Sequence, residues 1–246
     1  MTRGSLAGAW VCLIVLVALA ADAQQSAADS GAVALAARVQ RFLVHDASIL
    51  DGIAQLSFEH TELSFAFEGV LKAKFTDPEP PQQHFDLDLE NRTLGEIIEA
   101  LCSKDARYTW TQDGLNVNVF PRSTLNDASY LPNRRLAQFE LRHVTNAQQA
   151  VFAAAAQLPP PFEQIAFAQA GGETAYGAPW SATFTNLTVR QAFNLIARRL
   201  GPRGGWVFGG SREFRTIGFH RGDIHYVSPK PRTAAQPVDG PVAGRE

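Results

Sequence analysis

A helix-capping unit that occurs four times in the chain constrains the fold most strongly. In each unit a hydroxyl residue follows a short strand-like segment, and Asp, Glu or Gln stands three residues later. In such a capping box the hydroxyl accepts a hydrogen bond from an amide of the first turn, while the other side chain accepts one from the cap amide. The four pairs are Ser48 with Asp51, Thr93 with Glu96, Thr145 with Gln148, and Thr188 with Gln191.

Apolar residues stand in register with these caps. Each unit has two of them six and four residues before the cap, where they alternate with polar residues, and two more five and eight residues after it. The spacing predicts a strand with one buried face followed by a helix with one buried face. The strand positions are Phe42 and Val44, Leu87 and Leu89, Phe139 and Leu141, Ala182 and Phe184; the helix positions are Ile53 and Leu56, Ile98 and Leu101, Ala150 and Ala153, Phe193 and Ile196.

The four units fall into two kinds. The second and fourth are each followed by an aromatic strand and a hairpin, at 108–119 and 206–219, whereas the first and third lead to a single strand, at 63–67 and 165–168. Because the units pair off, a solenoid of three or more alike repeats is disfavoured. The sequence predicts an α+β fold made of two tandem small βαβ-βαββ domains, in each of which two helices pack with small mixed sheets.

The start of the chain has the pattern of a secretory signal peptide. Arg3 precedes an uncharged run over 6–21, and Ala21-Asp22-Ala23 offers an A-x-A cleavage site. The run is shorter than the roughly 20 apolar residues of a membrane-spanning helix, so no stable membrane span is expected after cleavage. We expect export to the periplasm, either free or associated with the outer membrane. The predicted segments are a signal peptide at 1–23, a linker at 24–40, a first domain at 41–122, a linker at 123–134, a second domain at 135–226 and a disordered Pro-rich tail at 227–246.

The positions of the cysteines and the distribution of charge narrow the possible modifications and partners. Cys12 lies inside the apolar run, away from the cleavage site, so lipidation is not expected, and Cys102 remains as a buried small hydrophobe without a disulfide partner. Residues 24–129 carry 8 Lys and Arg against 16 Asp and Glu, whereas residues 130–246 carry 13 against 7. The oppositely charged halves either dock against one another or face different partners. No nucleic-acid partner is expected for an exported chain.

The first domain resembles the short N-terminal domain of secretins and TonB-dependent receptors, the STN family. The segments that carry the resemblance are FLVHDASILDGIAQLS, HTELSFAFEGV and HFDLDLENRTLGEIIEALCSKDARYTWTQDGLNVNVFP. The second domain is similar more weakly, through WSATFTNLTVRQAFNLIARRLGPRGGWVF. The resemblance implies a small α+β module that makes protein contacts in the periplasm, with a secretion-system partner or an anti-sigma regulator. No secretin core or TonB box follows the repeat, so we do not expect the chain itself to be a channel or receptor.

Candidate chemical groups are sparse. His220, Asp223 and His225 in FHRGDIHY have no standard metal-ligand spacing, and a turn that leaves the last strand explains them better. Asp86, Asp88 and Glu90 alternate with leucines, which is typical of the solvated face of a strand rather than a calcium or glycosidase site. We therefore predict no metal, no cofactor and no catalytic residue.

Three further motifs have structural interpretations. Asn91 and Asn186 begin glycosylation sequons whose threonines already serve as predicted helix caps. Trp110 and Trp206 occupy equivalent strands and are expected to pack in the core rather than stack on a sugar. The Gly-rich segments GPRGG and FGG do not lie between a strand and a helix start, as a phosphate-binding loop requires.

The sequence favours a non-enzymatic protein-interaction module of the bacterial envelope, since its strong patterns all build scaffold. Contact through exposed sheet edges and helix faces, including strand addition, would be its mechanism. Two alternatives remain open. One is a small ligand-binding protein or enzyme with its site at the Pro/Gly-rich loop 157–179 and the interdomain cleft; the other is a binder of cell-wall polysaccharide. The binding residues themselves are not identified.

Overall fold

The computed structural model describes residues 29–158, 165–168, 175–201 and 203–221. The α+β class is confirmed, and both halves have the same order of elements. The first half contains β1 (Arg38–Ala47), α2 (Ile49–Glu59), β2 (Ser64–Glu68), β3 (Phe85–Thr93), α3 (Leu94–Lys104), β4 (Tyr108–Asp113) and β5 (Asn116–Pro121). The second half contains β6 (Arg135–Asn146), α4 (Ala147–Ala156), β7 (Ile165–Ala168), β8 (Ala175–Thr188), α5 (Val189–Arg199), β9 (Gly204–Gly210) and β10 (Arg215–Arg221).

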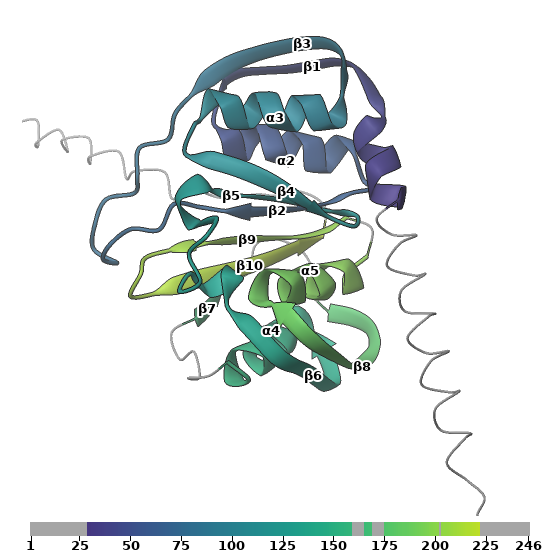
Figure 1. Cartoon of the computed structure of the whole chain (residues 1–246), viewed down its shortest axis with the longest axis vertical. Coiled ribbons are helices and arrows are strands. Elements are labelled where there is room, and N and C mark those ends of the chain that lie inside the picture. Colours follow the sequence, from purple (N-terminus) through teal and green to yellow (C-terminus); the bar gives the residue numbers. More distant parts are fainter. Residues whose placement is uncertain (1–28, 159–164, 169–174, 202, 222–246) are drawn as a thin grey trace, which may run out of the picture.

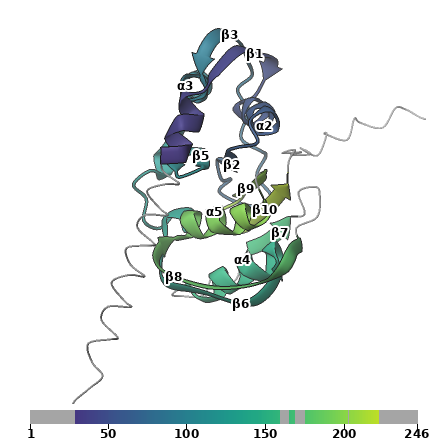
Figure 2. The ribbon, with the colours of Figure 1, turned by 90° about the vertical axis from the view of Figure 1, so that its right-hand side faces the viewer.

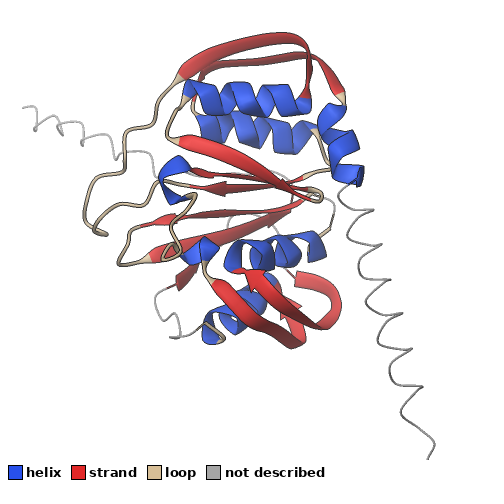
Figure 3. Ribbon diagram, viewed as in Figure 1, coloured by secondary structure: helices blue, strands red, loops and turns tan. Residues whose placement is uncertain are grey.

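The two halves share one sheet. Among the described residues it has six strands in the order β4-β5-β2-β9-β10-β7. Its central contact joins β2 of the first half to β9 of the second, in parallel, with Ala66 opposite Trp206 and Glu68 opposite Phe208. The halves are therefore connected by main-chain pairing as well as by the segment between them, and Figures 1 and 3 show the sheet between the two helical layers.

The helices of the two halves cover opposite faces of this sheet. Phe65 and Phe67 of β2 point into the core that α2 and α3 complete, whereas Ala66 between them belongs to the core of the second half. Trp206 and Phe208 of β9 lie in that second core as well. Because successive strand residues point to opposite faces, α2 and α3 lie on one face and α4 and α5 on the other.

A two-stranded antiparallel ribbon closes each helical layer on its outer side. The ribbon β1–β3 places Phe42 opposite Leu89, and the ribbon β6–β8 places Phe139 opposite Phe184. These are equivalent positions, six residues before one predicted cap and four before the next. Figure 2 shows β6 and β8 curving around α4, so each helix pair lies between a ribbon and the shared sheet.

Three of the four predicted caps form as expected. Ser48, Thr93 and Thr188 each make a complete capping box with the residue three positions later. The prediction for the third helix was wrong by one residue. Its cap is Asn146, which accepts from the amide of Gln149, while the amide of Thr145 donates to the Gln149 side chain. The ribbon register shifts on both sides of Val144, which moves the start of the helix by one position.

The repeat extends to individual hydrogen bonds. Arg38 donates to the main-chain and side-chain oxygens of Asn91. Arg135 donates in the same way to the side chain of Asn186. Both asparagines have a positive φ, 52° and 56°, two residues before a helix cap. Asparagine tolerates this left-handed conformation better than most residues, which explains its place in both Asn-x-Thr motifs.

The segments expected to be linkers contain ordered structure. Residues 29–36 are helical, and β1 begins at Arg38, inside the predicted linker 24–40. In the second linker the short 3-10 helices Arg122–Thr124 and Leu131–Asn133 form, and Tyr130 and Leu131 are buried. The predicted signal peptide and Pro-rich tail lie outside the described residues, as does most of the loop 157–179. Within the described residues, no helix has the length and hydropathy needed to cross a membrane.

Candidate functional site: a groove at the junction of the two halves

A groove of about 320 Å³ opens where β2 and β9 end. This volume is at the lower end of the range of about 300 to 1,000 Å³ that is typical of ligand pockets. Gly69 and Val70 follow β2, and Gly209 and Gly210 end β9, so both halves contribute to it. We call this feature the junction groove. Its other walls are residues 48–50 at the start of α2, residues 79–83, and the turn at 105–108.

The topology of the sheet explains why a groove forms at this place. β2 and β9 are adjacent and parallel, so their carboxyl ends lie at the same edge of the sheet. The helices that accompany them lie on opposite faces, and the start of α2 forms one wall beside the strand ends. In open α/β sheets ligands bind at the carboxyl ends of strands where the helix cover changes face. The junction of the two halves has the same geometry.

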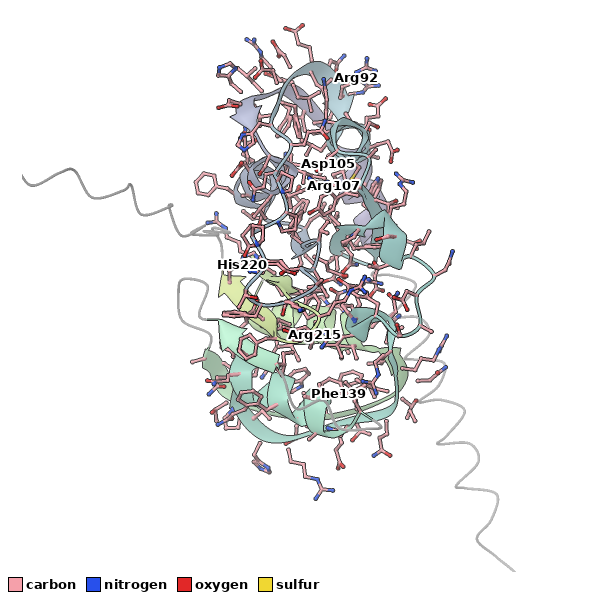
Figure 4. The ribbon with its side chains drawn as sticks, turned by 90° about the vertical axis from the view of Figure 1, so that its left-hand side faces the viewer. Arg92, Asp105, Arg107, Phe139, Arg215 and His220 are labelled. Atoms are coloured by element: carbon pink, nitrogen blue, oxygen red, sulfur yellow. The ribbon has the colours of Figure 1, made fainter. Side chains whose placement is uncertain are left out.

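The groove combines apolar and polar walls. Apolar side chains include Leu50, Phe67 and Val207. On the polar side, Arg107 and Asp105 form two hydrogen bonds, and an Nη1 of Arg107 also donates to the main-chain oxygen of Pro81. Figure 4 shows Asp105 and Arg107 together in the first half. The arginine therefore fixes the wall that residues 79–83 form.

Two exposed aromatic side chains lie near the groove. Phe75 and Phe214 pack edge to face with their ring centroids 5.6 Å apart, and their exposed fractions are 60% and 39%. Lys72 connects the loop of Phe75 to the groove. Its main chain forms an isolated parallel β-bridge with Ser211, and its Nζ forms an ion pair of 3.0 Å with Glu79, which lines the groove. Exposed aromatic pairs of this kind are common anchors in protein interfaces.

A buried ion pair connects the two halves on the other face of the sheet, opposite the junction groove. Arg190 of α5 donates through Nε and an Nη to both carboxylate oxygens of Glu68, at 2.5 and 2.9 Å. Its remaining Nη donates to Asn133, and its guanidinium lies 4.3 Å from the ring centre of Phe120. Burial raises the pKa of Glu68 above its ordinary value, and the hydrogen bonds and charge of Arg190 oppose that rise.

The repeat does not place a second arginine at the equivalent position of the first half. Arg190 stands two residues after the cap Thr188, and the equivalent position after Thr93 is Gly95. The first half therefore has no arginine at the corresponding place on α3. The ion pair joins α5 of the second half to β2 of the first, next to the pairing of β2 with β9.

Of the three residues that were considered as metal ligands, one lies in the described part of the chain. His220 lies in β10 and is 1% exposed, with its ring against Gly205 of β9; Figure 4 shows it at the junction. Asp223 and His225 lie outside the described residues. Within the described part of the chain no group of three His, Cys, Asp or Glu side chains is placed to hold a metal ion.

The carboxylates of β3 lie on its solvated side. Asp88 pairs with Arg41 at 2.8 Å, and this contact lowers the pKa of the carboxyl group. Asp86 accepts from the main-chain amide of Asp46, which lowers its pKa in the same direction. Glu90 is exposed. Asp86 and Asp88 are thus held by residues of β1 on the outer face of the ribbon.

Trp110 and Trp206 occupy equivalent positions but differ in depth. The indole nitrogen of Trp110 donates to Glu99, and that of Trp206 donates to Asn194, at 2.7 and 2.9 Å. Glu99 and Asn194 both stand six residues after a cap. Trp206 is fully buried, whereas Trp110 is partly buried. The prediction of core packing is confirmed for Trp206.

The groove residues were not found from sequence. Gly69 directly follows β2 and Gly209 lies at the end of β9, and FGG was considered only as a phosphate loop. The available signal was the pair of glycines at a strand end. These glycines come together only because β2 pairs with β9, and that pairing joins residues far apart in the sequence.

Comparison with known proteins gave no relative: no family model, no curated protein and no solved structure matches the chain.

Proposed function

We propose that the chain is a non-enzymatic protein-interaction module of the bacterial cell envelope, exported to the periplasm, and that its junction groove holds an extended segment of a partner protein. The observation that carries the proposal is the groove at the carboxyl ends of β2 and β9, with the exposed pair Phe75 and Phe214 beside it. The signal-peptide pattern and the resemblance of 41–122 to the STN family support the location and the class of function.

The walls of the groove define the chemistry of the expected segment. Leu50, Phe67 and Val207 offer an apolar surface for one side chain of the partner. Gln82 and Gln83 carry amides that donate to and accept from a main chain. Gly209 has no side chain, and a Cβ at its position would meet nothing closer than 3.9 Å, so a partner main chain can approach it.

The same glycine provides a direct test. In G209W the new indole would fill the groove, and the open surroundings of Gly209 predict that the fold tolerates it. Gly177 of β8 is a matched control, since a Cβ there meets nothing within 4 Å and the residue lies outside the groove. Tagged wild-type protein, G209W and G177W would be recovered from the envelope after mild cross-linking, and bound proteins quantified by mass spectrometry.

The proposal predicts that wild type and G177W recover the same specific partner and that G209W loses it by about tenfold or more, equivalent to about 1.4 kcal/mol of binding free energy. Equal recovery by G209W would place the interaction elsewhere. Recovery by wild type of only the proteins that an unrelated exported control also captures would contradict the function itself.

A further inference from the structure

A second cavity lies on the opposite face of the shared sheet, beside the first turns of α5. Its volume is about 400 Å³. We call it the polar cavity, because each of its lining side chains carries hydrogen-bonding groups. The lining residues are Thr111, Gln112, Asp113, Asn118, Arg135, Asn186, Thr188, Arg190, Gln191 and Asn194.

Three parts of the fold converge on this cavity. Thr111 of β4 and Asn118 of β5 are cross-strand partners, so their side chains share one face of the sheet. Phe120, two residues further along β5, points to the same face and lies beneath Arg190. The cavity is therefore lined by the sheet of the first half, by α5, and by the adjoining ends of β6 and β8.

Asn118 is the buried polar group that points to a ligand. It is 1% exposed, and its Oδ1 has no hydrogen-bond partner among the described residues. Buried polar side chains are nearly always hydrogen-bonded, and an exception requires an explanation. Asn118 lines the cavity, so a polar molecule bound there can complete its hydrogen bonding.

The charges of the cavity do not favour an anion. Arg190 is neutralised by Glu68, and Arg135 shares the lining with Asp113. The start of α5 is also occupied, since Thr188 accepts from the amide of Gln191 and the Gln191 side chain accepts from that of Thr188. Few free amides remain to hold a phosphate or carboxylate.

The lining instead matches a neutral molecule rich in hydroxyl groups. Thr188, Gln191 and Asn194 already bond to partners within the chain. Thr111 and Asn118 remain, and Thr and Asn side chains both donate and accept, as hydroxyl groups do. The lining has no aliphatic or aromatic side chain that would accept an apolar residue of a peptide. We infer that the polar cavity is a binding site for a neutral saccharide. This inference does not depend on the junction groove, which opens on the other face of the sheet.

Binding of trisaccharides to the chain 24–246 tests the inference. Tri-N-acetylchitotriose and maltotriose would be titrated by calorimetry and by NMR of the side-chain amides, with inorganic phosphate as the anionic probe. N118L removes the unpartnered amide and keeps the branched shape of the side chain, with the same number of heavy atoms. T111V removes a hydroxyl from an exposed lining residue, and T109V makes the same change on the same face of β4 outside the cavity.

We expect at least one trisaccharide to bind saturably, with a Kd below about 1 mM. We expect N118L to weaken that binding about tenfold or more and T111V to weaken it about threefold, because each variant loses a hydrogen bond to the ligand. T109V should leave the binding unchanged. Far-UV circular dichroism checks the fold of N118L, and T111V keeps the test valid if that variant unfolds. Binding of neither trisaccharide, binding of phosphate alone, or unchanged binding in both T111V and folded N118L would overturn the inference.

Discussion

Arg190 of the second half and Glu68 of the first half form a two-point ion pair through the centre of the molecule, where the carboxylate is fully buried and the arginine side chain is 14% exposed. The ion pair joins α5 to β2 on the face of the shared sheet that α5 covers. The acidic and basic halves therefore dock directly, and the stability of the junction depends on this pair more than on the many exposed charges around it.

Breaking one member of the pair should be costly. We expect R190M to lower the free energy of unfolding by about 3 to 5 kcal/mol, because Glu68 would remain buried without a counter-charge. The double variant E68L with R190M should recover most of that loss, since both charges are absent. Urea denaturation of the three proteins measures the difference. If single and double variants were equally destabilised, lost packing would be the cause instead of the unpaired charge.

The hydrogen bonds of the two tryptophans should contribute differently to the free energy of unfolding. Asn194 accepts from buried Trp206 and donates to Asp113, so N194L should cost about 1 to 3 kcal/mol of stability. Glu99 is exposed and accepts from the partly buried Trp110, and E99L should cost less. Guanidinium denaturation followed by tryptophan fluorescence compares the two variants. Equal losses would contradict the different depths of the equivalent sites.

The capping boxes predict opposite pH responses in two variants. The main-chain hydrogen bond from Thr93 lowers the pKa of Glu96, so its ionised form stabilises the folded chain. This contribution is present above the unfolded pKa and is lost as the pH falls through the folded one. E96Q should therefore lose less stability on acidification than wild type, and Q191E, which places Glu at the equivalent position of α5, should lose more. Thermal unfolding between about pH 3 and 7 tests the pair; identical pH profiles would count against it.

The thiol of Cys102 should react slowly in the folded protein. The residue is 2% exposed, and burial raises the pKa of its thiol to about 12. Since the thiolate is the reactive form, iodoacetamide at pH 8 should modify the folded chain 24–246 far more slowly than the same chain in urea. Mass spectrometry over time gives both rates. Rapid labelling without denaturant would show that the helix α3 opens readily.

Local patterns predicted the elements well because the caps and apolar positions act over a few residues. Phe42, Ile53, Ile98 and Phe193 were expected to face the interior, and each is buried. The third cap was misplaced at Thr145 because Asn146 beside it also caps, and the register shifts in β6 and β8 that decide between them depend on strand pairing.

Long-range pairing explains what the sequence could not show. Asn116 and Asn118 alternate with valines in the predicted hairpin 108–119, yet both are 1% exposed, and Asn118 lies beside Asn194 of the distant helix α5 in the polar cavity. Nothing within β2 or β9 indicates that they pair with each other. The shared sheet, the junction groove and the polar cavity all follow from that one contact between distant segments.

Photo-cross-linking in living cells shows directly whether the junction groove binds a partner. A benzophenone amino acid would replace Gln82, an exposed residue of the groove wall, or Gln138, an exposed residue of β6 outside it. With a partner segment in the groove, we expect a discrete cross-linked product of defined mass with the probe at position 82 and none with the probe at 138. No product at 82, or the same products at both positions, would contradict it.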